Sequence, residues 1–184
     1  MTFLPKLEGN YQPLKVYIAE ADRGLRGPVE RAAEQWNWED PERRSYLPDL
    51  VTVVHDPAEA DVVVHWVKEV DDVLLASGES VVLKDSAYGC TITNTATGKV
   101  DIFLDKFMHL QLGPGWRIPV ALHEIGHALG LRHEDATIPN GIMQRGLVDV
   151  TEGHGFRMVT QQERELARDL RVLGVVGVDS LVGN

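Results

Sequence analysis

The order of elements in this sequence predicts an α+β fold: a small, mixed, twisted β-sheet with one helix in the N-terminal half, one in the middle and one at the C-terminal end. Three observations support this expectation. Short β-branched runs recur through the first 104 residues, apolar residues from Val29 to Trp36 recur at helical spacing, and a helix-capping signal lies near the end. The 184 residues suit a single domain, 1–184, because this length buries a sizeable core but is short for two.

The first elements are a strand and a helix. Residues 14–19 alternate polar and apolar side chains, which predicts a strand. A turn over residues 24–27 leads to Pro28, which is favoured at the first position of a helix. The apolar spacing carries this helix to about Trp38, and we expect Trp36 and Trp38 to pack in the core.

Four strands are expected next. Residues 50–54 and 61–67 are β-branched runs, and the second is apolar enough for the centre of a sheet. Residues 88–94 and 99–104 flank four residues that end in Gly98, which predicts a hairpin. We expect 88–94 at the open edge of the sheet, with Cys90 as an ordinary small side chain in that strand.

Helices dominate the second half of the chain. Pro119 predicts the start of a long helix and Gly130 its end. Thr160 and Glu163 form a capping box, which predicts a last helix through about residue 172.

Composition excludes several classes of partner. The formal net charge is −10, which argues against nucleic acid or an anionic membrane as the main partner. No run approaches the roughly 18 apolar residues of a membrane-spanning helix. The single cysteine allows no disulfide within the chain. The start of the sequence has no apolar signal region, so it indicates either a cytoplasmic protein or a secreted domain whose signal has been removed. We expect a monomer.

The sequence HEIGHALGLRH, which begins at His123, carries the chemistry. His123 and His127 are four residues apart on a helix, so both imidazoles project from one face and can bind one ion. Glu124 is offset by about 100° around the helix, close enough to reach water on the ion but not a natural ligand. Gly130 allows a sharp turn that can bring His133 back as a third imidazole.

Three neutral imidazoles and an open position describe a catalytic zinc site rather than a closed structural one. Water bound to such an ion can lose a proton near neutral pH and attack a carbonyl. No cysteine lies nearby, which excludes a zinc finger.

The pattern HExxHxxGxxH resembles the signature of the metzincins, a family of zincin peptidases in which a methionine turn follows the third histidine. Gly141-Ile142-Met143 supplies that methionine. The chain is most similar to a matrixin catalytic domain, in its compactness and in the wording of the motif. The resemblance implies a metzincin-like domain in which one Zn²⁺ has three histidine ligands, a glutamate is the general base and the methionine underlies the metal: His123, His127, His133, Glu124 and Met143.

Other features depart from the matrixin pattern. Glu134 follows the third histidine, as in astacins, and neither Gln144 nor Arg145 is the tyrosine that astacins and serralysins place after the methionine. Residues 68–88 contain no histidine, so we expect no second, structural zinc. The acidic residues 69–72 could hold calcium, but their spacing is not that of an EF-hand loop, and a solvated face is expected.

The sequence therefore predicts an endopeptidase that hydrolyses internal bonds of a peptide or protein with zinc-activated water and Glu124 as general base. Substrate is expected along Thr91, Ile92 and Thr93, with residues 145–159 forming the specificity pocket and His154 available to an oxyanion. Two alternatives remain open: a catalytically silent metzincin-like scaffold that binds a partner, and a zinc amidase acting on a non-protein amide.

Overall fold

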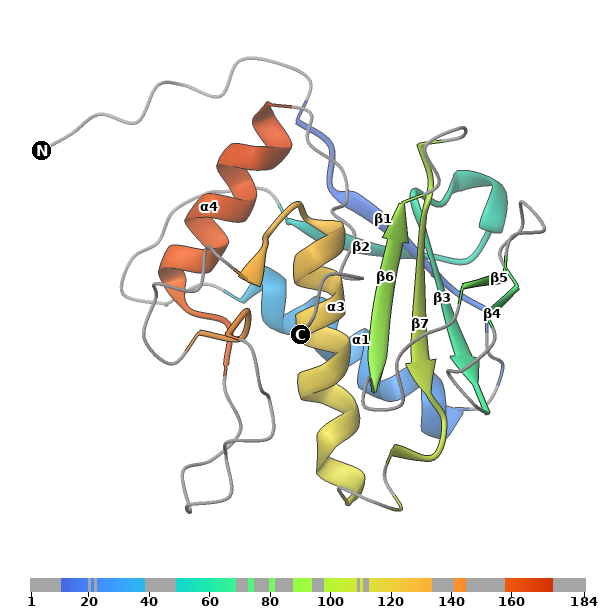
Figure 1. Cartoon of the computed structure of the whole chain (residues 1–184). Coiled ribbons are helices and arrows are strands. Elements are labelled where there is room, and N and C mark those ends of the chain that lie inside the picture. Colours follow the sequence, from blue (N-terminus) through green and yellow to red (C-terminus); the bar gives the residue numbers. More distant parts are fainter. Residues whose placement is uncertain are drawn as a thin grey trace, which may run out of the picture.

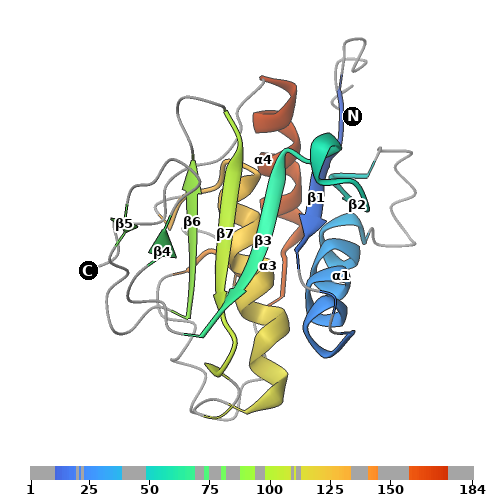
Figure 2. The same ribbon diagram turned by 90° about the vertical axis from the view of Figure 1, so that its right-hand side faces the viewer.

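A computed structural model gives the fold of this chain (Figure 1). It describes residues 11–19, 21, 23–38, 49–68, 73–74, 80–81, 88–93, 98–108, 110, 113–133, 141–144 and 158–173. Within them the chain forms an α+β fold, as predicted, with a five-stranded mixed sheet and three helices. Figures 1 and 2 show the three helices α1, α3 and α4 on the same face of that sheet.

The five strands of the sheet lie in the order β2-β1-β3-β7-β6. The first four are mutually parallel, and β6 is antiparallel to β7. Their bounds in chain order are β1 Leu14–Ile18, β2 Val51–Val54, β3 Val62–Val67, β6 Gly89–Thr93 and β7 Val100–Asp105. The strand β3 is central, as its apolar run predicts, and its side chains are alternately buried and partly buried.

Two short strands and a 3₁₀ turn lie outside the five-stranded sheet. The strands β4 (Val73–Leu74) and β5 (Ser80–Val81) pair antiparallel as a separate two-stranded sheet. The 3₁₀ turn η2 (Pro57–Glu59) connects β2 to β3 and is capped by Asp56, whose carboxylate accepts a hydrogen bond from the Ala58 N–H at 2.8 Å.

The predicted hairpin is confirmed. Gly89 in β6 pairs with Leu104 in β7, and Thr93 pairs with Val100. Gly98, two residues before the start of β7, has φ 69°, a value that glycine adopts without strain. In the described part of the chain β6 pairs with β7 alone, so it forms the edge of the sheet. Cys90 is buried within β6.

The helix α1 (Arg23–Asn37) begins five residues before Pro28, where the sequence predicted its start. Pro28 has no N–H to donate to the carbonyl of Gly24, four residues earlier. The Arg117 guanidinium donates a hydrogen bond to that carbonyl instead, with Nη1 at 3.2 Å from the Gly24 oxygen. A contact from a distant helix therefore lets α1 extend through its proline.

The helix α3 (Arg117–Ala128) follows a 3₁₀ turn, η3 (Pro114–Trp116), and begins two residues before Pro119. A proline is tolerated in the first turn of a helix because the N–H groups there have no helical partner. The last helix, α4 (Gln161–Val172), has the predicted capping box: Thr160 Oγ1 accepts from the Glu163 N–H, and the Glu163 carboxylate accepts from the Thr160 N–H at 2.8 Å.

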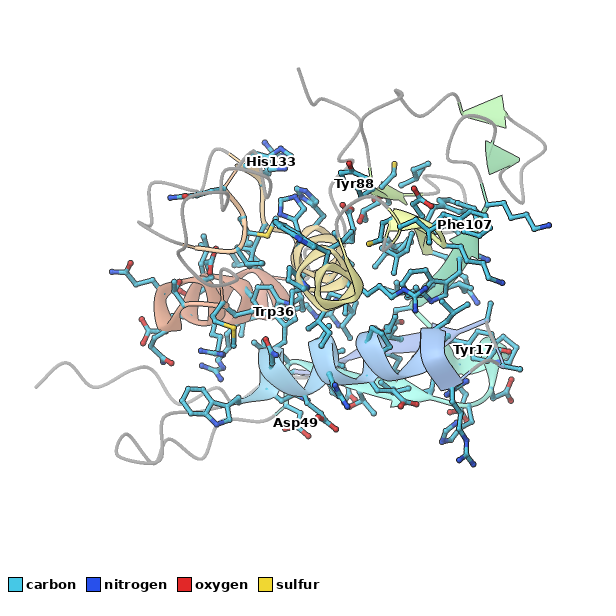
Figure 3. The ribbon with its side chains drawn as sticks, turned by 90° about the horizontal axis from the view of Figure 1, so that it is seen from below. Tyr17, Trp36, Asp49, Tyr88, Phe107 and His133 are labelled. Carbon is cyan, nitrogen blue, oxygen red and sulfur yellow. The ribbon has the colours of Figure 1, made fainter. Side chains whose placement is uncertain are left out.

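The core lies between the sheet and the helices, and Trp36 joins α1 to α3 within it (Figure 3). The Trp36 side chain is fully buried, and its indole N–H donates to the Leu122 carbonyl at 3.0 Å. The same prediction was wrong for Trp38, which is 58% exposed and lies under the Arg164 guanidinium, 5.6 Å from the ring centroid. Trp38 follows the end of α1, where the chain has left the helix face that meets the core.

Among the described residues, no helix combines the length and the hydropathy that crossing a membrane requires.

Candidate metal centre

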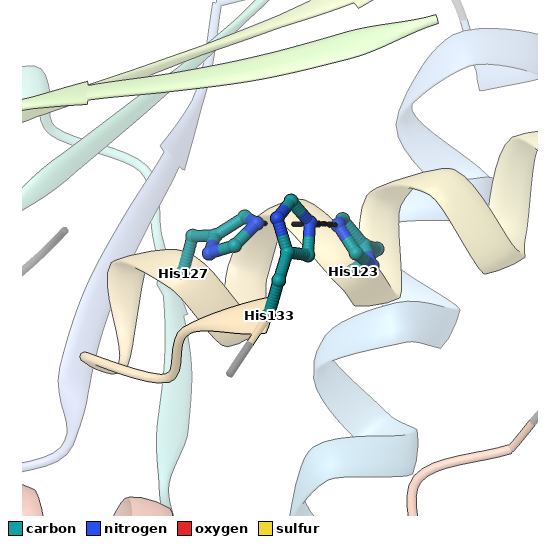
Figure 4. A group of neighbouring side chains, drawn as sticks. All are labelled: His123, His127 and His133. Carbon is teal, nitrogen blue, oxygen red and sulfur yellow. Dashed lines mark hydrogen bonds between the residues drawn. The ribbon is translucent and has the colours of Figure 1, made fainter. Parts of the chain in front are cut away.

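Three histidine side chains converge at the C-terminal end of α3 (Figure 4). His123 and His127 lie one turn apart on α3, and His133 follows the helix. The Nε2 atom of His123 is 3.1 Å from that of His127 and 2.9 Å from that of His133. The ligand atoms of the three residues all lie within 4.8 Å of one another, so the predicted set of three is brought together.

The turn that returns His133 to the helix depends on Gly130, which has φ 97°. The Gly130 N–H donates to the His127 carbonyl at 2.9 Å, and the Leu131 N–H donates to the Gly126 carbonyl at 3.0 Å. These two bonds form a Schellman motif, which ends a helix with one residue in the left-handed region. A side chain at Gly130 would be strained there, so the glycine of the sequence motif has a direct geometric cause.

The hydrogen bonds on the other ring nitrogens fix two of the tautomers. His123 Nδ1 is 2.8 Å from the Ile142 carbonyl oxygen, and His127 Nδ1 is 2.8 Å from the Leu131 carbonyl oxygen. A carbonyl oxygen only accepts, so both Nδ1 atoms carry a hydrogen and donate it. In the neutral rings each Nε2 atom therefore presents a lone pair to the centre.

Burial keeps His127 neutral. Desolvation, reinforced by the neighbouring His123, lowers the pKa of the His127 imidazole from 6.5 to about 3. The neutral His127 ring, whose hydrogen is on Nδ1, therefore turns its Nε2 lone pair toward His123 Nε2, 3.1 Å away. This lone pair is available to a metal ion.

The donor set fits zinc. Imidazole nitrogens at about 2.0–2.1 Å from a tetrahedral zinc ion are about 3.3–3.4 Å apart. The Nε2 separations of 2.9 and 3.1 Å are slightly shorter than that spacing. Both His123 and His127 also donate from Nδ1 to a main-chain carbonyl, which is the usual way in which proteins orient a zinc-bound histidine.

Glu124 is next to His123 in the sequence, but it is not one of the three described residues whose ligand atoms converge. Its side chain is only 4% exposed and faces β6, where Thr91 Oγ1 donates to Glu124 Oε2 at 2.7 Å. The carboxylate of Glu124 is therefore held by the edge strand β6.

Met143 packs against the helix that carries the histidines. Its side chain is 1% exposed, and a Cβ atom added to Gly126 would overlap its sulfur and lie 3.1 Å from Cζ2 of Trp36. Gly126 lies between His123 and His127 in the sequence, so the missing side chain there makes room for the methionine directly under this turn of α3. The neighbouring residue Ile142 supplies the carbonyl that orients His123.

The turn that contains Met143 is tied to α4 by Glu163, a link that the sequence did not reveal. Glu163 is 1% exposed; its Oε1 atom accepts from the Met143 N–H at 2.9 Å, while Oε2 accepts from Thr160. The capping box predicts the second contact, because it is local. No sequence signal predicts the first, because its partner lies twenty residues away (163 − 143) and bonds through its main chain.

The predicted substrate strand has mostly buried side chains. Thr91 is fully buried and Ile92 is 6% exposed, while Thr93 is intermediate. The side chains of Thr91 and Ile92 therefore belong to the interior of the protein. His154, Glu134, Arg145, the acidic residues 69–72 and most of the predicted pocket segment 145–159 lie outside the described residues.

Comparison with protein-family models and with curated proteins finds no match to this chain.

Proposed function

We propose that this protein is a zinc-dependent endopeptidase of the metzincin type, with His123, His127 and His133 holding one zinc ion and Glu124 acting as general base. The observation that carries the proposal is the convergence of the three Nε2 atoms, two of them on rings whose hydrogens are committed to main-chain carbonyls. Such a site binds a divalent ion and leaves room for water or substrate.

The position of β6 supports a peptide as substrate. β6 is the edge strand, and it contacts α3 through the hydrogen bond between Thr91 and Glu124. An extended peptide could add to this edge by main-chain hydrogen bonds and would then pass directly over the base and the histidines. The buried side chains of β6 leave its main chain as the group that would meet the substrate.

The chemistry divides between the ion and the chain. A zinc ion bound here would act as a Lewis acid toward the scissile carbonyl and would make water acidic at neutral pH. Glu124 would accept the proton of the attacking water and pass it to the leaving amine. Because its Oε2 atom already accepts from Thr91, the carboxylate would be oriented for this transfer before substrate arrives.

Metal analysis and proteolysis test this proposal together. Purified protein should contain about one zinc per chain and should cleave a denatured protein, and a chelator should abolish the cleavage. His133→Gln should lose both zinc and activity, whereas His55→Gln, which alters an exposed histidine on β2's C-terminal side, should lose neither.

The other outcomes separate the two alternatives. A protein that holds zinc and binds unfolded chains without cleaving them would be a scaffold. Turnover of small or cell-wall amides without turnover of peptides would make it an amidase. Absence of bound zinc, or equal zinc content in His133→Gln, would refute the metal site itself.

A further inference from the structure

We propose that Thr91 and Gly89 are positioning residues for Glu124, so that the edge strand sets the conformation of the general base as well as receiving the substrate. This inference rests on the proposed function. It assigns Thr91 a role through its side chain, which is turned away from the open edge of the sheet and into the protein.

The hydroxyl group of Thr91 contacts Glu124 at two points. Its Oγ1 atom lies 2.7 Å from Glu124 Oε2 and 3.0 Å from the main-chain oxygen of Glu124. The single hydroxyl hydrogen is shared between these two acceptors, so Thr91 links the end of the Glu124 side chain to its own main chain and restricts the torsions in between. Thr91 itself is β-branched and fully buried, so its own χ1 is fixed by packing.

Gly89 bounds the other side of the carboxylate. It lies two residues before Thr91 and therefore on the same face of β6. A Cβ atom at Gly89 would lie 2.8 Å from Glu124 Cγ and 2.9 Å from Oε1, and 3.0 Å from Val120 Cγ1. These distances are shorter than van der Waals contact, so a side chain at Gly89 would displace the glutamate. The space that Glu124 occupies exists because residue 89 is glycine.

Together the two residues restrict the position of the Glu124 carboxylate. Thr91 bonds one oxygen, and Gly89 leaves room for the other. A glutamate on an exposed helix face samples several rotamers, whereas a base must meet its proton within hydrogen-bond reach. The alternative is that Thr91 only satisfies a buried polar group and so contributes to stability alone. The two roles differ in what they predict for kcat.

Three variants and one control test the positioning role. Thr91→Val keeps the shape and removes the hydroxyl, Thr91→Ser keeps the hydroxyl, and Gly89→Ala adds the displacing Cβ atom. Thr52→Val, an exposed position on β2 at the far edge of the sheet, is the control. For each protein the kcat and KM on one peptide, the zinc content, and a crystal structure of the zinc-loaded form are measured.

Thr91→Val should lower kcat by about ten-fold or more with KM changed by less than about two-fold, because misplacing a reacting group by about 1 Å can cost roughly a hundred-fold. Zinc content should be unchanged, since all three imidazoles remain. Thr91→Ser should have a kcat close to that of the wild type, because it keeps the hydroxyl. Gly89→Ala should lower kcat although it retains the Thr91 hydroxyl. In the crystal structure of Thr91→Val, Glu124 should leave the conformation that it has in the wild type.

The proposal is overturned if Glu124 keeps its conformation in Thr91→Val, or if that variant turns over like the control. If the wild type cleaves no peptide, the proposed function fails, and the crystal structures still decide whether Thr91 and Gly89 position the carboxylate. If Thr91→Val does not fold, the other two variants decide the question. Glu124 should be displaced and kcat lowered in Gly89→Ala, and both should be as in the wild type in Thr91→Ser.

Discussion

Replacement of Glu163 by glutamine should destabilise the protein and weaken its hold on zinc. The carboxylate accepts from Met143 N–H through one oxygen and from Thr160 N–H through the other, in a site that is 1% exposed. Glutamine has a single acceptor oxygen, so its NH₂ group must face one of these N–H donors. One buried donor is then left without a partner, and a second donor is forced against it.

The size of the effect follows from that count. A buried donor without a partner costs about 1–3 kcal/mol, which is the expected loss for Glu163→Gln. Glu163→Ala leaves both donors without the carboxylate and should lose roughly twice as much. Met143 and Ile142 belong to the same turn, and the Ile142 carbonyl orients His123. Zinc affinity should therefore fall by about 10–100-fold, the usual cost of disturbing a partner behind a metal ligand.

Urea unfolding and competition with a chromophoric zinc chelator measure the two quantities. Glu165→Gln is the matched control, because Glu165 lies on the same helix and is exposed. Its carboxylate accepts a hydrogen bond from the nearby Gln161 side chain at 3.0 Å. If Glu163→Gln differs from this control by less than about 0.5 kcal/mol, the range of ordinary surface substitutions, the link between α4 and the Met143 turn carries no energy.

Three further results are expected. Met143→Leu should keep the fold and much of the activity, because a side chain of similar volume fills the space at Gly126; loss of folding, or sulfur found bound to the metal, would contradict this role. Trp36→Phe should lower the free energy of unfolding by about 1 kcal/mol or more, through loss of the hydrogen bond to the Leu122 carbonyl, and denaturant titration would measure it. Metal-free protein should lose stability as the pH falls from 6.5 toward about 3, because the unfolded chain protonates His127 at its ordinary pKa of 6.5 while burial holds the folded pKa near 3. Urea midpoints of chelator-treated wild type and His127→Gln at about pH 7 and about pH 5 would test it, and an equal loss in both proteins would refute it.

The elements that the sequence predicts well are those with local causes. The strand β3 follows from a run rich in valine, and the start of α4 follows from a capping box in which both partners lie within three residues. The three histidines follow for the same reason, since helical spacing and one glycine turn bring them together.

Contacts between distant segments account for the rest. The sequence predicts that α1 begins at Pro28, whereas the structure begins it earlier, with Arg117 donating to the Gly24 carbonyl that Pro28 cannot bond. The sequence predicts that substrate lies along Thr91, but it does not reveal that the Thr91 hydroxyl bonds Glu124, thirty-three residues away along the chain (124 − 91). Neither contact has a spacing or a composition that marks it, because each depends on how the sheet and helices pack.

The proposed role of Glu124 as general base of a zinc peptidase is decided by the kcat of wild type and Glu124→Gln on one peptide, together with the zinc content of both proteins. Glutamine keeps the size of the side chain and an acceptor for Thr91 while removing the base. Zinc content and folding should be nearly unchanged, since the three imidazoles remain, and kcat should fall by at least about 10²–10⁴-fold. A Glu124→Gln protein that holds zinc and cleaves the peptide within a few-fold of the wild-type rate would show that Glu124 is not the general base.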